Sequence, residues 1–213
     1  NLVKKYPEVV DWWDYEANNG EHPEEYTLFS PMKAHFVCPK CGGKYHLRIT
    51  DAFSLSDDGT PKLFKCSYCN NIRALSGFNT LADVKPGLVS EWSSNNELKA
   101  DEVLPESYNR ALWICPTCGG EYSALIRDRE VGDDACPYCK NIRPLVGYNT
   151  LADKKPELVS EWSPNNESKP DEVVATSTLP VLWICPTCHG EYSTPIRNRE
   201  FGDDSCPYCR NKK

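Results

Sequence analysis

Twelve cysteines give this chain its clearest chemical signal. Two thiolates separated by two residues in a tight turn can face one tetrahedral ion, with backbone N–H groups directed at the sulfurs, and a second such pair completes a zinc shell of four sulfurs. We therefore predict three zinc ions per chain, each held by four cysteines. The six C-x2-C pairs combine into three sets, and no cysteine is left over for a reactive nucleophile: Cys38, Cys41, Cys66 and Cys69; Cys115, Cys118, Cys136 and Cys139; Cys185, Cys188, Cys206 and Cys209.

A disulfide framework is the alternative that an even number of cysteines allows in a secreted protein. Cysteines of one C-x2-C pair are poorly placed for a mutual structural disulfide, and the sequence begins without an apolar signal-like segment. A redox function would need one exposed pair, not six in a regular array. Because free thiolates imply a reducing compartment, we expect a cytoplasmic protein. The first residue is Asn, so we also expect a piece of a longer chain.

The cysteine sets recur because the sequence contains an internal repeat. Residues 79–143 align with 149–213 after a shift of 70 positions, and the segment before them is a more divergent copy with a 7-residue insertion between its cysteine pairs. We predict zinc-finger repeats at 1–78, 79–148 and 149–213. A core of this size supplies roughly 3–5 kcal/mol, whereas a structural zinc supplies on the order of 10–16 kcal/mol. Zinc is therefore expected to be the main source of stability.

Each repeat contains the same elements to position its cysteines. Apolar residues at helical spacing and a proline in TLADVKPGLVSEW (80–92) predict a broken helix. A polar linker follows, and ALWIC (111–115) predicts a strand entering the first C-x2-C turn. We call each such C-x2-C turn a knuckle. The alternation of Tyr122, Ala124 and Ile126 predicts a further strand, and with a turn at 131–134 we expect a β-hairpin between the cysteine pairs. These elements predict a small zinc-stabilised α+β fold of three tandem treble-clef or zinc-ribbon-like repeats, each a broken helix, linker, knuckle, β-hairpin and second knuckle.

Aromatic residues recur at two positions of the repeat and are expected in the core. The broken helices end in a tryptophan that we interpret as an anchor packed on the finger, not as a base-stacking residue: Trp13, Trp92 and Trp162. The residue two places before the first cysteine is also aromatic and is expected to shield the metal from water: Phe36, Trp113 and Trp183.

The order of motifs resembles a known family. NTLADxKPxLVSEW, a polar linker, LWICPTCGGEYSALIRDR and GDDACPYC are similar to the tandem treble-clef or probable zinc-ribbon repeats of bacteria and mobile elements. The resemblance covers the whole chain and implies zinc-binding units in arrays, sometimes attached to restriction-like endonuclease domains, and hence nucleic-acid recognition. Many members use Cys and His in the first knuckle; this chain has Cys118 and Cys188 there, so His189 is expected to be a neighbour and not a ligand. Ala52 stands in the first copy where the others have Arg129 and Arg199.

Basic side chains around the fingers are the candidate nucleic-acid contacts, with Tyr122 and Tyr192 as candidate stacking residues. The alternative for the arginines is pairing with nearby acids such as Asp128, Glu130, Asp133 and Asp134. The net charge of −7, with no copy basic overall, argues against simple nucleic-acid binding. The candidate contacts are Arg48, Arg127, Arg129, Lys140, Arg143, Arg197, Arg199 and Arg210.

Two functions stay open from the sequence. The first is a zinc-finger array that targets a larger protein to nucleic acid, DNA in preference to RNA. The alternative is a protein-interaction or spacer array whose partner is another protein or a further domain of the same chain. No enzyme is expected, because four cysteines leave each zinc without an open position and no catalytic constellation repeats. No membrane span and no small-molecule substrate are expected either.

Overall fold

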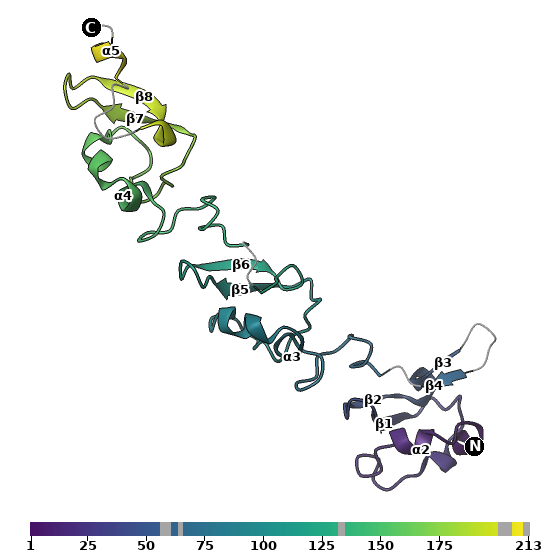
Figure 1. Ribbon diagram of the computed structural model, residues 1–213. Coiled ribbons are helices and arrows are strands. Elements are labelled where there is room, and N and C mark those ends of the chain that lie inside the picture. The colour runs from purple at the N-terminus through teal and green to yellow at the C-terminus, as the bar shows by residue number, and fades with distance from the viewer. Residues whose placement is uncertain (56–60, 64–65, 132–134, 200–205, 211–213) are drawn as a thin grey trace. The chain divides into compact units, whose positions relative to one another are not determined.

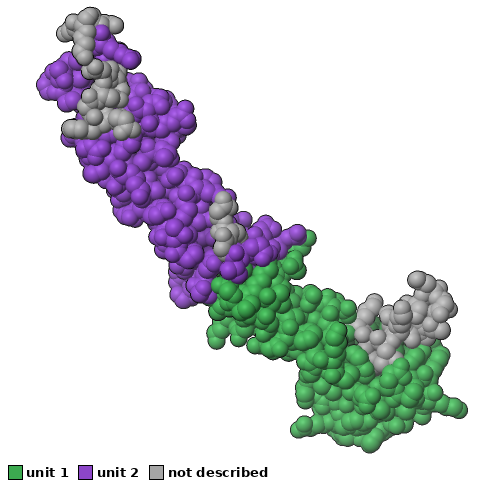
Figure 2. Space-filling model, in the orientation of Figure 1, with its two compact units in different colours: residues 1–89, 96–109 green, residues 90–95, 110–213 purple. Residues whose placement is uncertain are grey.

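The computed structural model describes residues 1–55, 61–63, 66–131, 135–199 and 206–210. Figure 1 shows short helices and two-stranded hairpins that recur along the chain. The chain divides into two compact units, 1–89 with 96–109 and 90–95 with 110–213 (Figure 2). This division falls inside the second repeat, and the three repeat boundaries stay predictions. None of the helices in the described ranges has the length and apolar character that crossing a membrane requires.

Each repeat has a broken helix and an antiparallel hairpin, as these element bounds show. The first contains α1 (Leu2–Lys5), α2 (Val9–Trp12), the 3₁₀ turn η1 (Pro23–Glu25), β1 (Lys33–Val37), β2 (Lys44–Arg48), η2 (Ile49–Ala52), β3 (Phe53–Leu55) and β4 (Pro61–Leu63). The second contains α3 (Leu81–Val84), η3 (Pro86–Glu91), β5 (Arg110–Ile114) and β6 (Glu121–Leu125). The third contains α4 (Leu151–Lys154), η4 (Pro156–Glu161), β7 (Pro180–Ile184), β8 (Glu191–Pro195), η5 (Ile196–Asn198) and α5 (Pro207–Arg210).

The predicted broken helix is confirmed, and its ends follow from local chemistry. Thr80 caps α3 in a capping box: its hydroxyl accepts the Asp83 N–H at 3.3 Å, and the Asp83 carboxylate accepts the Thr80 N–H at 2.9 Å. Hydrogen bonds from Thr80 hold the pKa of Asp83 below its usual value. Pro86 then starts η3, where the missing N–H of a proline is tolerated. Thr150 and Asp153 form the same box at the start of α4.

The position of the predicted hairpin is wrong for the second and third repeats. We expected both strands between the cysteine pairs, but β5 and β6 enclose the first pair, with Trp113 opposite Tyr122. The C-x2-C turn is itself the tight connection, so the strand that leaves it pairs with the strand that entered it. The first repeat adds a hairpin between its cysteine pairs, β3 with β4, within its longer inner segment; the described residues between the pairs of the other two repeats contain no such second hairpin. The predicted turn at 131–134 lies, beyond its first residue, outside the described residues.

The polar linkers are irregular as predicted, apart from the 3₁₀ turn η1 in the first, and an asparagine in them holds the hairpin. The Asn166 side chain donates to the Leu182 carbonyl and accepts the Leu182 N–H, both at 2.8 Å. Asn18 makes the same two contacts with His35. These contacts satisfy backbone groups on the outer edge of the strand that precedes the first knuckle.

A second asparagine joins each finger to the repeat that follows. Asn149 is 2% exposed; its amide donates to the carbonyls of Tyr138 at 2.8 Å and Arg143 at 2.9 Å, and its oxygen accepts the Leu145 N–H at 2.7 Å. The next residue, Thr150, caps α4. Asn79 makes the equivalent contacts before α3. The connection between a finger and the next broken helix is therefore a fixed turn and not a free linker.

The predicted aromatic core is confirmed for the residues before the first cysteine, since Phe36, Trp113 and Trp183 are all fully buried. Phe36 shares a core cluster with Cys38, and Trp183 shares one with Cys185. The tryptophans that end the broken helices pack edge-on against them, with ring centroids 5.1 Å apart for Trp92 and Trp113. The aromatic positions therefore connect the helix to the hairpin.

The second and third repeats bury an ion pair beside these rings. Arg129 is 1% exposed and donates to the carboxylate of Glu91, which is 6% exposed. The guanidinium also lies over the rings of Trp113 and Tyr122, 5.1 and 5.7 Å from their centroids. The third repeat repeats the arrangement with Arg199, Glu161, Trp183 and Tyr192. At the corresponding positions the first repeat has Ala52 for the arginine and Trp12 for the glutamate.

Replacing Arg129 alone is expected to destabilise the second repeat strongly. Arg129→Met leaves Glu91 buried without its partner, which costs about 3–5 kcal/mol, whereas Arg129→Met with Glu91→Leu removes both charges and is expected to recover most of that loss. Urea unfolding of the zinc-loaded chain, followed by tryptophan fluorescence, gives the comparison. Arg110→Met, at an exposed arginine of the same hairpin, is the control. A double variant as unstable as the single one would contradict this account.

Candidate metal centres

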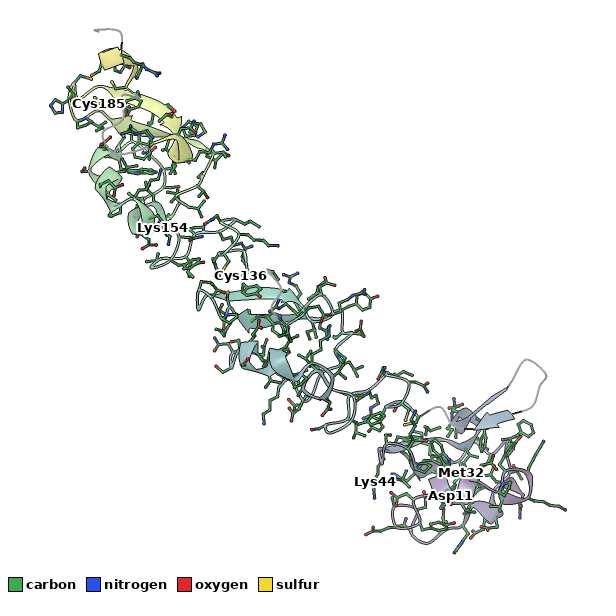
Figure 3. All side chains as sticks on the ribbon, viewed as in Figure 1. Asp11, Met32, Lys44, Cys136, Lys154 and Cys185 are labelled. Atoms are coloured by element: carbon green, nitrogen blue, oxygen red, sulfur yellow. The ribbon has the colours of Figure 1, made fainter. Side chains whose placement is uncertain are left out.

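The twelve cysteines form the three predicted clusters. Within each cluster all four sulfurs lie within 4.8 Å of one another (Figure 3 labels Cys136 and Cys185). None of the twelve is in a disulfide. The disulfide alternative therefore finds no support in this geometry. Each cluster draws two sulfurs from the knuckle that the hairpin encloses and two from the second C-x2-C pair, which lies in a turn in the first two repeats and at the start of α5 in the third: Cys38, Cys41, Cys66 and Cys69; Cys115, Cys118, Cys136 and Cys139; Cys185, Cys188, Cys206 and Cys209.

The sulfur separations fit a tetrahedral zinc ion. Four sulfurs at about 2.3 Å from a central zinc are about 3.8 Å apart from one another. The sulfurs of Cys115 and Cys139 are 3.6 Å apart, and those of Cys185 and Cys209 are 3.8 Å apart. Such distances are far longer than the roughly 2.05 Å of a disulfide bond. An all-thiolate tetrahedron is the donor set of a closed, structural zinc site.

The first knuckle of each finger is closed by backbone hydrogen bonds. The Cys115 N–H donates to the Gly120 carbonyl at 3.0 Å, and the Gly119 N–H donates to the Cys115 carbonyl at 2.8 Å. Gly119 has φ +70°, a conformation that glycine adopts without strain. In the third repeat His189 takes that position with φ +57°. His189 is therefore part of the turn, and the four sulfurs complete the cluster without it, as predicted.

A tyrosine inside the second knuckle locks the two knuckles together. The Tyr138 hydroxyl donates to the Glu121 carbonyl at 2.9 Å, next to the first knuckle. Its ring packs on Gly120, where an added Cβ would lie 2.6 Å from a ring carbon. Tyr68 with Gly43 and Tyr208 with Gly190 repeat the contact. The C-x-Y-C form of the second pair is thus explained by packing against the glycine two residues after the first pair.

Backbone N–H groups favour ionisation of the first sulfur in the first knuckle of each finger. The Cys188 N–H acts on Cys185 and lowers its pKa to about 6. Burial opposes ionisation of Cys115, but the N–H groups of Cys118 and Thr117 outweigh it and lower its pKa to about 7. Burial, together with the neighbouring sulfurs, raises the pKa of Cys118 to about 12. One thiolate therefore forms readily, and the others need a bound cation, so zinc binding must release protons and weaken on acidification.

Comparison with known proteins decides the family. A family model described as a probable treble clef zinc finger domain matches residues 88–142 and 158–212. The chain belongs to this treble clef zinc finger family. The matched segments contain the second and third cysteine clusters, and the first cluster has the same geometry. A search of curated proteins found no match to the chain. The fold, the repeats and the three zinc ions follow from the family together with the clusters.

Two of the predicted nucleic-acid contacts are wrong. Arg129 and Arg199 are each 1% exposed and bound to buried glutamates, so their guanidinium groups cannot reach a phosphate in this fold. The stacking role predicted for Tyr122 and Tyr192 is wrong for the same reason, because they lie buried beneath these arginines. Acidic residues next to the arginines in the sequence suggested an exposed, charged segment. The glutamates that bind the arginines lie 38 positions earlier in the chain.

The other six predicted contacts lie on or near the surface, but two of them pair with acids. Arg48 binds Asp51 at 2.8 Å, and Arg127 lies 3.4 Å from Asp128, as the alternative interpretation predicted. Lys140, Arg143, Arg197 and Arg210 are exposed. Neither Asp133 nor Asp134 lies within the described residues. The binding of nucleic acid by these six side chains stays a prediction.

Sequence reasoning missed Arg73, which occupies the place of Arg143 in the first repeat. Both follow the second cysteine pair in the motif Asn-Ile-Arg and both are exposed. The motif recurs 70 positions apart, and this repetition was the signal that could have identified Arg73.

Removing one ligand is expected to empty one site only. Cys139→Ser takes a sulfur from the middle cluster, and repeat arrays couple mainly to their neighbours, so the zinc content should fall from three ions to two per chain. Native mass spectrometry measures this directly. Tyr148→Phe is the control, because it removes only the hydroxyl that lies 3.5 Å from the Cys139 sulfur. Loss of all three ions from Cys139→Ser would contradict a modular array.

Proposed function

We propose that the chain is a zinc-dependent nucleic-acid-binding array, with duplex DNA as its preferred ligand, that targets a larger protein. The observation that carries the proposal is a basic turn repeated after the second cysteine pair. Arg73 and Arg143 stand at equivalent positions of this turn in the first and second repeats. Cations repeated at a fixed place in tandem units are suited to a ligand with repeated charge, such as a phosphate backbone.

The backbone of this turn is fixed by hydrogen bonds. Asn141 has φ +56°, and the N–H groups of Ile142 and Arg143 both donate to the Pro137 carbonyl, at 2.8 and 3.2 Å. The Asn149 amide holds the Arg143 carbonyl at 2.9 Å. In the first repeat Asn71 has φ +53°, and the Arg73 N–H donates to the Ser67 carbonyl at 3.1 Å. A fixed backbone with an exposed arginine limits the entropy lost when the side chain contacts a ligand.

The charges of this turn are available despite the acidic balance of the chain. Among the described residues, no carboxylate forms an ion pair with Arg73 or Arg143. Many of the acids lie instead in the polar linkers, where Asp101 and Glu102 are exposed. A net charge of −7 therefore does not exclude local basic surfaces on the fingers.

A protein-binding array is the second candidate, and one observation favours it. Ile72 and Ile142, next to the two arginines, are 69% and 68% exposed. An exposed isoleucine at the same place in two repeats would suit an apolar contact with a protein partner. The partner would be another protein or a further domain of the same chain.

The thiolate ligands also support a proposal about location. Cysteines that must remain reduced to bind zinc are suited to a reducing compartment, so we propose that the array works in the cytoplasm.

Removing the repeated cations is expected to weaken DNA binding. The variant Arg73→Ala/Arg143→Ala should bind duplex DNA less tightly, and the slope of log affinity against log salt should fall by about 0.9 for each phosphate that the variant no longer neutralises. Fluorescence anisotropy with a labelled duplex, starting at about 50 mM salt, measures both quantities.

The control for this variant is Lys4→Ala/Lys5→Ala, which removes two exposed cations elsewhere. Both variants should keep three zinc ions. Equal effects of the two variants would show that only net charge matters. A wild-type chain without affinity for duplex or single strands at low salt would remove the proposal and leave the protein-binding candidate.

A further inference from the structure

A cavity of about 310 Å³ lies where the finger of the second repeat meets the start of the third. Its cationic lining residues are Lys154 and Lys155, at the end of α4, and Arg197 in η5; Asn141 and Thr176 also line it. Figure 3 labels Lys154 in this region. The volume is near the lower end of the range of pockets that hold small ligands, about 300–1,000 Å³. The cavity is thus large enough for a small group and not for an extended one.

The walls of the cavity are held by hydrogen bonds. Ala175, a lining residue, donates its N–H to the Asn149 carbonyl at 3.1 Å, and the Arg197 N–H donates to the Ser177 carbonyl at 3.0 Å. The Lys155 ammonium donates to the Arg199 carbonyl. The Lys154 ammonium lies 5.3 Å from the centroid of the Tyr148 ring. Both lysine side chains are therefore held at defined places.

The charge of the lining points to an anion. The chain has 31 acidic and 24 basic side chains, yet the described residues that line this cavity include three cations and no carboxylate. Among the described residues, no carboxylate forms an ion pair with Lys154 or Arg197. The Asn141 oxygen accepts from Asn149 at 3.3 Å, which directs the Asn141 NH₂ group to act as a donor. The lining therefore combines cations with neutral donors.

We infer that this cavity holds one phosphate group of a bound nucleic acid, an inference that rests on the proposed function. Lys154 and Arg197 supply the charge, and Asn141 and Thr176 supply neutral donors. Because the cavity combines residues of two successive repeats, it acts only when both are folded. One phosphate would then fix the register of the ligand across that junction.

The sequence restricts this site to the second junction. At the positions that correspond to Lys154 and Thr176, the second repeat has Val84 and Glu106. Those two differences replace a cation by an apolar residue and add an acid. The second repeat therefore supplies a natural pair of substitutions with which to test the site.

The test transfers that pair into the third repeat. Lys154→Val/Thr176→Glu should lower the affinity for a labelled duplex by about tenfold, the effect expected for the loss of one charged hydrogen bond. Lys169→Val/Thr178→Glu is the matched control, because it changes the charge equally at exposed residues of the same repeat outside the cavity lining. It should lower the affinity much less. Equal losses in the two variants would overturn the inference while leaving the proposed function intact.

A titration with inorganic phosphate tests the cavity independently of nucleic-acid binding. If the wild-type chain binds no oligonucleotide, the proposed function fails. A titration with inorganic phosphate, followed by NMR at the backbone amides of Lys155 and Thr176, then decides the inference. Saturable shifts that disappear in Lys154→Val/Thr176→Glu would support an anion site, and their absence would overturn it.

Discussion

The rest of each finger depends on holding four sulfurs at the corners of one tetrahedron. Sulfur separations of 3.6–3.8 Å would place mutually repelling thiolates together unless a cation neutralises them. The surrounding structure serves this geometry: backbone N–H groups favour the first thiolate, the glycine at φ +70° closes the first knuckle, and Tyr138 ties the second knuckle to it. A small core with many irregular segments does not supply enough folding free energy to hold this geometry, so the fold depends on the bound metal. The chain in turn determines where the four sulfur ligands lie.

The turn that joins the second finger to the third repeat is held by hydrogen bonds. Asn149 satisfies three backbone groups of the second repeat's knuckle and is followed at once by the residue that caps the next helix. Here the turn after the second knuckle is fixed at the junction, and this turn carries Arg73 in the first repeat and Arg143 in the second. The same structural feature therefore links stability within the array to the surface that we propose for binding.

Much of this could be predicted from the sequence, because cysteine spacing and the repeat are local signals. The broken helix follows from Thr80, which caps the start of α3, and from Pro86, which starts η3. The hairpin partner was missed, because pairing depends on the C-x2-C turn acting as the connection. The buried ion pair of Arg129 was missed because its partner Glu91 lies far away in sequence and both look like surface residues. One signal did exist: the first repeat lacks both charges, and coupled loss of two charges is typical of a buried pair, since either one alone is costly.

The central claim, that three all-cysteine zinc sites organise the chain, can be tested most directly by X-ray absorption at the zinc edge on the purified protein. The account predicts three zinc ions per chain, each with four sulfur neighbours at about 2.3 Å and no nitrogen or oxygen neighbour. Nitrogen or oxygen neighbours at about 2.0–2.1 Å, or sulfur–sulfur bonds in place of bound zinc, would contradict it.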